Sequence, residues 1–113
     1  MLLSKGEKIF VVLRRLFETE VRRSFVGEVM EASDVAIKAQ GYEFIYDEAN
    51  NNFVRSELER SRIFSLIDAG TVLRVLPNDI NYEKIHYGWK GNQRVLTDEE
   101  SFVFHINVFG VLR

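Results

Sequence analysis

Apolar and polar positions alternate through residues 22–47, and this alternation is the clearest pattern in the chain. Its apolar or small members are Phe25, Gly27, Val29, Val35, Ile37 and Ala39. A period of two is typical of a half-buried β-strand, because successive side chains point to opposite faces of a sheet. Residues 31–34, Glu-Ala-Ser-Asp, interrupt the alternation with turn-forming side chains. The pattern therefore predicts two antiparallel strands joined by a tight connection.

The alternation changes phase near Gly41. Beyond this point the aromatic side chains of Tyr42, Phe44 and Tyr46 continue it one step out of phase, because position 43 is charged. A glycine inside a strand often marks a bulge or a sharp bend. We therefore expect a strongly bent second strand, which is what a small barrel needs.

The N-terminal apolar stretch, residues 9–17, fits two kinds of element. Its apolar positions satisfy the stripe of an amphipathic helix, so a helix over residues 5–22 is one alternative. Residues 9–12, Ile-Phe-Val-Val, are β-branched and aromatic, and such side chains pack better on a pleated sheet. We therefore predict a strand here, followed by a turn at residues 18–20 and a return strand from Val21.

Two short apolar segments, residues 63–67 and 71–76, flank the sequence Asp68-Ala69-Gly70. Three connecting residues that include glycine predict a tight hairpin, and Pro77 ends its second strand because proline has no backbone donor. Upstream, the asparagine-rich residues 47–52 predict a loop. The S-x-x-E sequence at residues 56–59 allows one or two helical turns over residues 56–62, with a charged loop as the alternative.

Residues 78–113 carry a β pattern of their own. Segments 85–89 and 93–96 flank a loop centred on glycine, which predicts a hairpin, and residues 102–109 alternate with one wholly apolar face. A chain of 113 residues fits one domain. We therefore predict a single all-β domain over residues 1–113, with a small five-stranded barrel at residues 9–77 and a C-terminal β-hairpin and strand extension at residues 78–113.

Composition limits the class of protein. The chain has no cysteine, which excludes disulfides, thiolate catalysis and cysteine-bound zinc. Nine Phe residues against one Pro argue against disorder. The longest apolar runs are far shorter than the roughly 20 residues of a membrane span, and no signal-peptide pattern is present. We therefore expect a soluble cytoplasmic protein with no membrane partner.

The sequence contains no catalytic or cofactor-binding constellation. The two histidines, His86 and His105, lack the spacing of a metal site. The acidic pairs at residues 47–48 and 99–100 lie in predicted loops, where carboxylates seldom act as general acids. No nucleophile elbow or phosphate-binding loop occurs. We therefore expect no enzymatic activity, no cofactor and no metal.

Basic side chains concentrate near the N-terminus. Residues 1–23 hold six basic and three acidic groups, whereas the whole chain has a net charge of −2. Arg14, Arg15, Arg22 and Arg23 are candidates for contacts with nucleic-acid phosphates, although arginine pairs that only solvate the surface are the favoured interpretation. The aromatic residues of segment 42–53, beside Arg55, are a candidate platform for stacking bases, with filling of the barrel and of a subunit interface as the favoured alternative.

The aromatic residues of the tail predict self-association. Tyr87, Trp89, Phe102 and Phe104 add more apolar area than a barrel of about 70 residues can enclose. Part of this surface is expected to cover the outside of the barrel or to contact another chain. We predict that these four residues form an interface in a symmetric homo-oligomer.

The order of strands over residues 9–77 resembles the Sm-like fold, the small bent barrel of the Sm proteins and the bacterial Sm-like RNA chaperone. Residues 25–29, Phe-Val-Gly-Glu-Val, are similar to the opening of the family's first motif, and residues 67–77 are similar to its second. The resemblance implies an Sm-like or related SH3-like barrel with a tendency to form rings through edge strands. The family's RNA-binding residues are not matched, because residues 33–37 contain no asparagine and Asp68 replaces the expected cation.

The leading expectation is therefore a non-enzymatic binding or scaffolding module that assembles into a homo-oligomer. The alternative is an RNA-binding protein that uses the basic N-terminal face.

Overall fold

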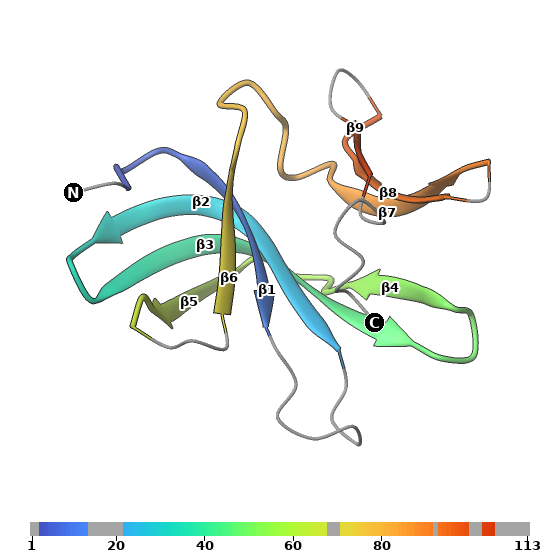
Figure 1. Cartoon of the computed structure of the whole chain (residues 1–113), viewed down its shortest axis with the longest axis horizontal. Helices are drawn as coiled ribbons and strands as arrows, with labels where there is room; N and C mark the ends of the chain where they lie inside the picture. Colours follow the sequence, from blue (N-terminus) through green and yellow to red (C-terminus); the bar gives the residue numbers. More distant parts are fainter. Residues whose placement is uncertain (1–2, 14–21, 68–70, 92, 100–102, 106–113) are drawn as a thin grey trace.

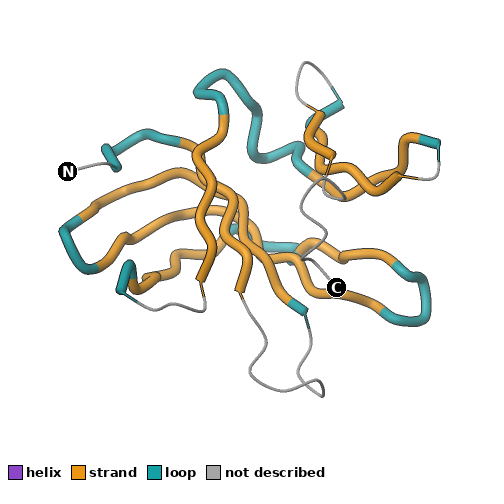
Figure 2. Tube along the Cα trace, in the orientation of Figure 1, coloured by secondary structure: helices purple, strands orange, loops and turns teal. Residues whose placement is uncertain are grey.

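The computed structural model describes residues 3–13, 22–67, 71–91, 93–99 and 103–105. Every regular element in these residues is a β-strand (Figure 1 and Figure 2). The strands are β1 (Lys8–Leu13), β2 (Arg23–Ala32), β3 (Ala36–Asp47), β4 (Asn52–Arg55), β5 (Arg60–Ser65), β6 (Thr71–Leu76), β7 (His86–Lys90), β8 (Gln93–Thr97) and β9 (Val103–His105). The all-β prediction is confirmed, and β1 is a strand as predicted. No described segment forms a helix long and apolar enough to cross a membrane.

These strands form two antiparallel sheets. The larger sheet has the order β4-β3-β2-β1-β6, and β5 pairs with the first half of β3 while β4 pairs with the second half. The smaller sheet has the order β7-β8-β9. Within the residues described, no ladder joins β5 to β6. The large sheet is therefore open and six-stranded, which corrects the prediction of a closed barrel of five strands.

The segments predicted as a tight hairpin, residues 63–67 and 71–76, do not pair with each other. β5 pairs with β3, whereas β6 pairs with β1 at the other edge of the sheet. The hairpin prediction is wrong because a short connection also allows a strand to leave one edge and join another. Of the two alternatives for residues 56–62, the helical turns do not form: Ser56 Oγ accepts a hydrogen bond from Glu43 N at 3.2 Å, and the extended strand β5 begins at Arg60.

The long hairpin of β2 and β3 forms as predicted. At its turn, Ser33 N donates to Ala36 O at 2.9 Å, and Ser33 Oγ accepts from Ala36 N at 3.2 Å. A register shift just before Glu31 places the bulge in β2 and not at Gly41. Gly41 instead lies opposite Gly27, and a Cβ on either would lie under 3.0 Å from backbone atoms of the opposite strand. The glycine pair therefore allows a close approach of the two strands.

The large sheet is covered on both faces. One core cluster contains Ile9, Val11, Phe25, Val29, Ile37, Ala39 and Phe64. The other contains Phe10, Val26, Phe44, Phe53, Leu76, Ile80, Ile85, Tyr87 and Leu96. Neighbouring residues of β1 belong to opposite clusters, so Ile9, Phe10 and Val11 are all buried. Two-sided burial explains the unbroken apolar run in this strand.

The C-terminal sheet covers the second face. Tyr87 on β7 and Leu96 on β8 belong to the same core cluster as Phe44 on β3 and Phe53 on β4. Strand β7 lies beside β4, as Figure 1 shows. Part of the tail therefore packs on its own chain. This is one of the two arrangements predicted for it, the other being contact with another chain.

Candidate functional site

The predicted basic face lies only partly within the described residues, because Arg14 and Arg15 fall outside them. Arg22 lies just before β2, and Arg23, the first residue of that strand, is exposed. The guanidinium carbon of Arg22 lies 5.7 Å from the ring centre of Tyr46 on β3. Arg22 is thereby placed at the end of the large sheet where β3 and β4 meet.

Arg22 belongs to a series of alternating arginine and aromatic side chains that connects the two sheets. Its members in order are Arg22, Tyr46, Arg94 and Trp89. The guanidinium carbon of Arg94, on β8, lies 5.8 Å from the ring centre of Tyr46 and 5.0 Å from that of Trp89 on β7. Each contact is a cation–π attraction, worth about 0.5–1 kcal/mol at an exposed site. We call these four residues the arginine–aromatic column.

The loop between β3 and β4 holds the middle of the column. Arg94 donates to the backbone oxygen of Asn51 at 2.8 Å and to Asn51 Oδ1 at 3.2 Å. The Tyr46 hydroxyl donates to the same Oδ1 at 2.6 Å. Asn51 has a positive φ of 49°, a backbone conformation that asparagine tolerates better than most residues. Arg94 is therefore fixed by a loop of one sheet while it belongs to the other.

The aromatic platform predicted beside Arg55 is not a continuous surface. Phe44 and Phe53 are buried in the core, in agreement with the favoured interpretation that they fill it. Tyr42 is partly exposed, and the guanidinium carbon of Arg55 lies 4.4 Å from its ring centre. Arg55 also donates to the backbone oxygen of Glu83. The bond to Glu83 ties β4 to the segment between β6 and β7.

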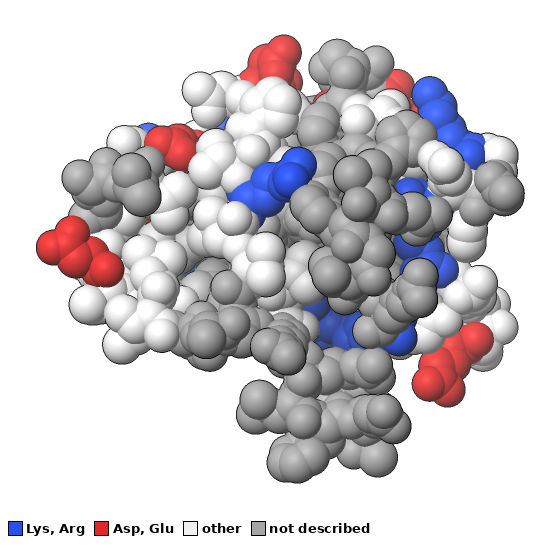
Figure 3. All heavy atoms as spheres, in the orientation of Figure 1, with Lys and Arg blue, Asp and Glu red and all other residues white. Residues whose placement is uncertain are grey.

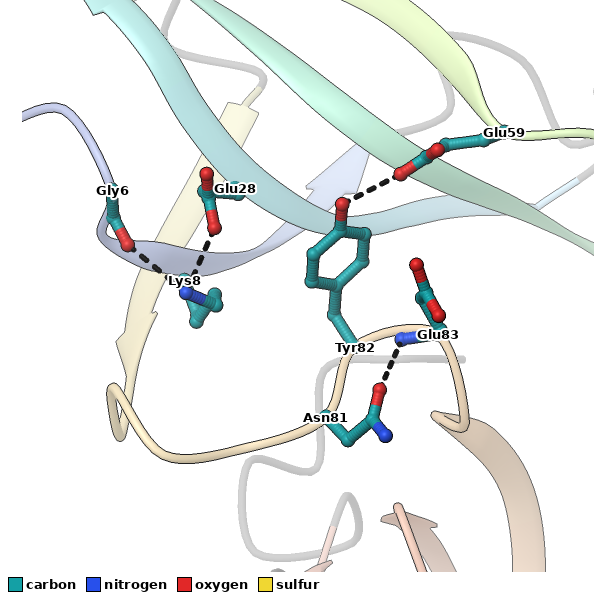
Figure 4. Close-up of polar contacts among 7 residues, drawn as sticks. All are labelled: Gly6, Lys8, Glu28, Glu59, Asn81, Tyr82 and Glu83. Carbon is teal, nitrogen blue, oxygen red and sulfur yellow. Dashed lines mark hydrogen bonds and ion pairs between the residues drawn. The ribbon is translucent and has the colours of Figure 1, made fainter.

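Tyr82 ties the same segment to the large sheet. Its hydroxyl donates to Glu59 Oε1 at 2.6 Å, just before β5, and the neighbouring Asn81 Oδ1 accepts from Glu83 N at 3.2 Å (Figure 4). Burial, and then the hydrogen bond to Glu59, raise the pKa of Tyr82 above its ordinary value. The hydroxyl therefore remains protonated and acts as the donor to the carboxylate.

The four residues predicted as an oligomer interface occupy different places. Tyr87 is buried within its own chain, with 5% of its surface exposed, which corrects its assignment to an interface. Trp89, two residues further along β7, is half exposed. Phe104 lies in β9, and Phe102 lies outside the described residues. Of the two whose side chains the structure describes, Trp89 is the one at the surface.

Tyr87 packs between the two sheets. Its ring stacks on Phe53 with the ring centres 4.2 Å apart, and it meets Phe44 edge-on at 5.1 Å. Its hydroxyl shares a hydrogen bond of 2.7 Å with Ser24 Oγ of β2. Burial raises the pKa of Tyr87 well above its usual value, although the bond to Ser24 and the charge of Arg94 act in the opposite direction.

Replacing Tyr87 with phenylalanine should make the free energy of unfolding fall less steeply as the pH rises above about 10. Because the pKa of Tyr87 is higher in the folded than in the unfolded chain, its contribution to stability is complete below about pH 10 and is lost as the pH rises further. One proton changes the free energy of unfolding by about 1.4 kcal/mol per pH unit. Urea titrations between about pH 10 and 11.5 measure the two slopes. Equal slopes would contradict the burial of the phenol.

No group of three His, Cys, Asp or Glu side chains that could hold a metal ion occurs among the described residues. His86 has protein partners instead: Nδ1 lies 3.0 Å from the backbone oxygen of Lys84, and Nε2 lies 3.1 Å from Glu99 Oε1. His105 lies in β9.

A second candidate surface was missed by sequence reasoning. β5 and β6 carry exposed aliphatic side chains, and neither strand has a described partner on its outer side. These side chains are Ile63 on β5, Ile67 just after it, and Val72 and Val75 on β6. Sequence reasoning missed these side chains because the predicted hairpin paired the two segments with each other. The available signal was that both segments are apolar at successive positions as well as alternate ones.

No protein-family model matches the chain, and no significant match to a curated protein or to a solved structure was found. Two surfaces of the described residues are candidates for function: the arginine–aromatic column and the outer edges of β5 and β6.

Proposed function

We propose that the protein is a non-enzymatic binding or scaffolding module that assembles with copies of itself through the outer edges of β5 and β6. The observation that carries the proposal is the exposure of large aliphatic side chains on both edges: Ile63 and Val72 leave 72% and 63% of their surfaces exposed. An unpaired edge presents backbone donors and acceptors, and proteins normally protect it with charges, proline or a covering segment. Isoleucine and valine instead favour burial against a second chain.

Both edge strands border the same core. Phe64 of β5 belongs to the cluster of Ile9 and Val11, and Leu73 of β6 packs against it. Strands β6, β1, β2, β3 and β5 therefore share one core, and the seam lies between the first and the last of them. This arrangement supports an incompletely closed Sm-like or SH3-like barrel as the underlying form. In our proposal, neighbouring copies rather than the chain itself complete the pairing at the seam.

Pairing of β5 in one copy with β6 in the next is a head-to-tail contact, because the two surfaces differ. Head-to-tail contacts form a ring when the rotation between copies closes, and an open filament when it does not. In a ring, every copy has both of these edges paired, which removes the hazard of uncontrolled edge-to-edge association. We therefore expect a closed homo-oligomer.

Light scattering tests the proposal. At about 50 µM, a concentration at which specific interfaces are normally populated, the wild-type protein should show a mass several times the 13.2 kDa of one chain. Ile63→Lys and Val72→Lys should each yield monomers, because burying an unpaired charge at an edge is strongly unfavourable. A monomeric wild-type protein would exclude self-association.

Val54→Lys is the matched control. Val54 is 53% exposed and is also a β-branched residue in an outer strand, but it lies on β4, away from the proposed contact. The mass of this variant should equal that of the wild type. Dissociation by Val54→Lys to the same degree as by Val72→Lys would show that the contact is not confined to β5 and β6.

A further inference from the structure

We propose that the arginine–aromatic column is a binding site for single-stranded nucleic acid, with a base stacking on Trp89 and a phosphate contacting Arg22. The inference starts from Trp89, the only tryptophan of the chain, which exposes 50% of its surface on β7. Tryptophan is usually well buried, and an exposed ring offers a stacking surface to any base. The site does not depend on self-association, because all of these residues belong to one chain.

The ring of Trp89 is oriented before any ligand arrives. Arg94 lies opposite it in the register of β7 and β8, with its guanidinium carbon 5.0 Å from the ring centre. Arg94 is in turn held by two hydrogen bonds to Asn51 and by its contact with Tyr46. A stacking surface that is already positioned loses little freedom on binding, and this favours affinity.

The charge around the column suits a polyanion. Arg22 and Arg94 supply two cations within the column, and the exposed Lys90 follows Trp89. Two acidic residues, Asp47 and Glu48, lie at the end of β3 and in the loop that holds Arg94. Figure 3 shows basic side chains on the half of the molecule that contains β4, β7 and β8, with an acidic group beside them at the lower right. Cations that follow a phosphate backbone, together with an aromatic stacking surface, are the two elements that bind single strands without sequence preference. An acidic peptide would satisfy the cations but would leave the Trp89 ring unused.

The single tryptophan makes the test direct, because its fluorescence reports on Trp89 alone. Oligothymidylate and oligouridylate of about 12 nucleotides should quench it at low salt, and the affinity should fall steeply as salt is added. Comparison of the two probes shows whether a 2′-hydroxyl is used. Polyglutamate of the same total charge should leave the fluorescence unchanged, since it provides charge without bases.

Substitutions then locate the contacts, with a fluorescein-labelled oligothymidylate as the probe. Trp89→Leu should weaken binding about tenfold, as expected for the loss of one stacked base, whereas Trp89→Phe should retain most of the affinity. Arg22→Gln should weaken binding and reduce the slope of log affinity against log salt by about 0.7. Arg60→Gln is the matched control, because Arg60 is an exposed arginine on β5; its effect should stay within about twofold.

Three results would overturn the proposal: no quenching at low salt with millimolar nucleotide, equal quenching by polyglutamate, or wild-type affinity in a Trp89→Leu variant whose circular dichroism is unchanged. The Ile63→Lys variant separates this proposal from self-association. It should be monomeric and still bind the oligonucleotide with wild-type affinity. Loss of binding in that folded monomer would contradict a site held by one chain.

Discussion

Replacing Gly41 with alanine should lower the free energy of unfolding by about 3 kcal/mol or more, at the upper end of the range for overpacked cores. An added Cβ would lie 2.5 Å from Gly27 Cα and 2.8 Å from the carbonyl carbon of Val26. These are backbone atoms of β2, so no side-chain rotation can relieve the clash. The hairpin would have to separate at its middle, between residues that belong to both core clusters. Small domains have only about 5–15 kcal/mol of stability in total.

Urea unfolding followed by far-ultraviolet circular dichroism measures this loss. With a slope of about 1.5 kcal/mol per molar urea, it corresponds to a midpoint lower by about 2 M. Gly88→Ala is the matched control: Gly88 lies in the middle of β7, and its added Cβ would meet only ring atoms of His86 at 4.0 Å. Its stability should change by less than about 0.5 kcal/mol. Equal stability of the two variants would show that β2 and β3 do not approach this closely.

Tyr87→Ala should cost about 3–5 kcal/mol, as expected for the loss of a large aromatic side chain from a core. The substitution removes the stack on Phe53 and the edge-on contact with Phe44, and it leaves Ser24 Oγ without its hydroxyl partner. Because Tyr87 belongs to the smaller sheet and Ser24 to the larger, the loss should loosen the packing of one sheet on the other.

The stability loss of Tyr87→Ala should be compared with that of Trp89→Ala. Trp89 is the larger residue and lies on the same strand, but half of its surface is already in water, so its loss should cost only about 1 kcal/mol. A greater loss for Trp89→Ala than for Tyr87→Ala would reverse the assignment of core and surface. Tyr87→Phe should also leave the light-scattering mass unchanged, because the substituted hydroxyl faces Ser24 and not a second chain.

The strands of the N-terminal half could be predicted because their signals are local. The β-branched run of β1 and the polar turn at Ser33 act over a few residues, and the structure confirms both. The phase change at Gly41 was visible in the sequence, but its cause was not. The buried side of β3 changes from the cluster of Ile37 to that of Phe44, and the glycine is needed because β2 passes close by.

The column could not be predicted, because its residues come from just before β2, the end of β3, β7 and β8. The sequence indicated Arg22 for its charge and Trp89 for its apolar area, and it gave no reason to connect them. Arg94 carries no local signal, since a single arginine in a strand is common. Its role arises from the loop around Asn51, which reaches it only when the smaller sheet packs on the larger.

The sequence by itself determined that this protein is built of β-strands, where most of those strands lie and where the chain turns between β2 and β3. Alternation, β-branching and turn chemistry act between near neighbours, so they can be recognised without a structure. Only the tertiary structure decided that β5 and β6 go to separate edges, that the C-terminal sheet covers one face, and that Tyr87 is core while Trp89 is surface. Those outcomes depend on packing between residues far apart in the chain, and no local pattern specifies it.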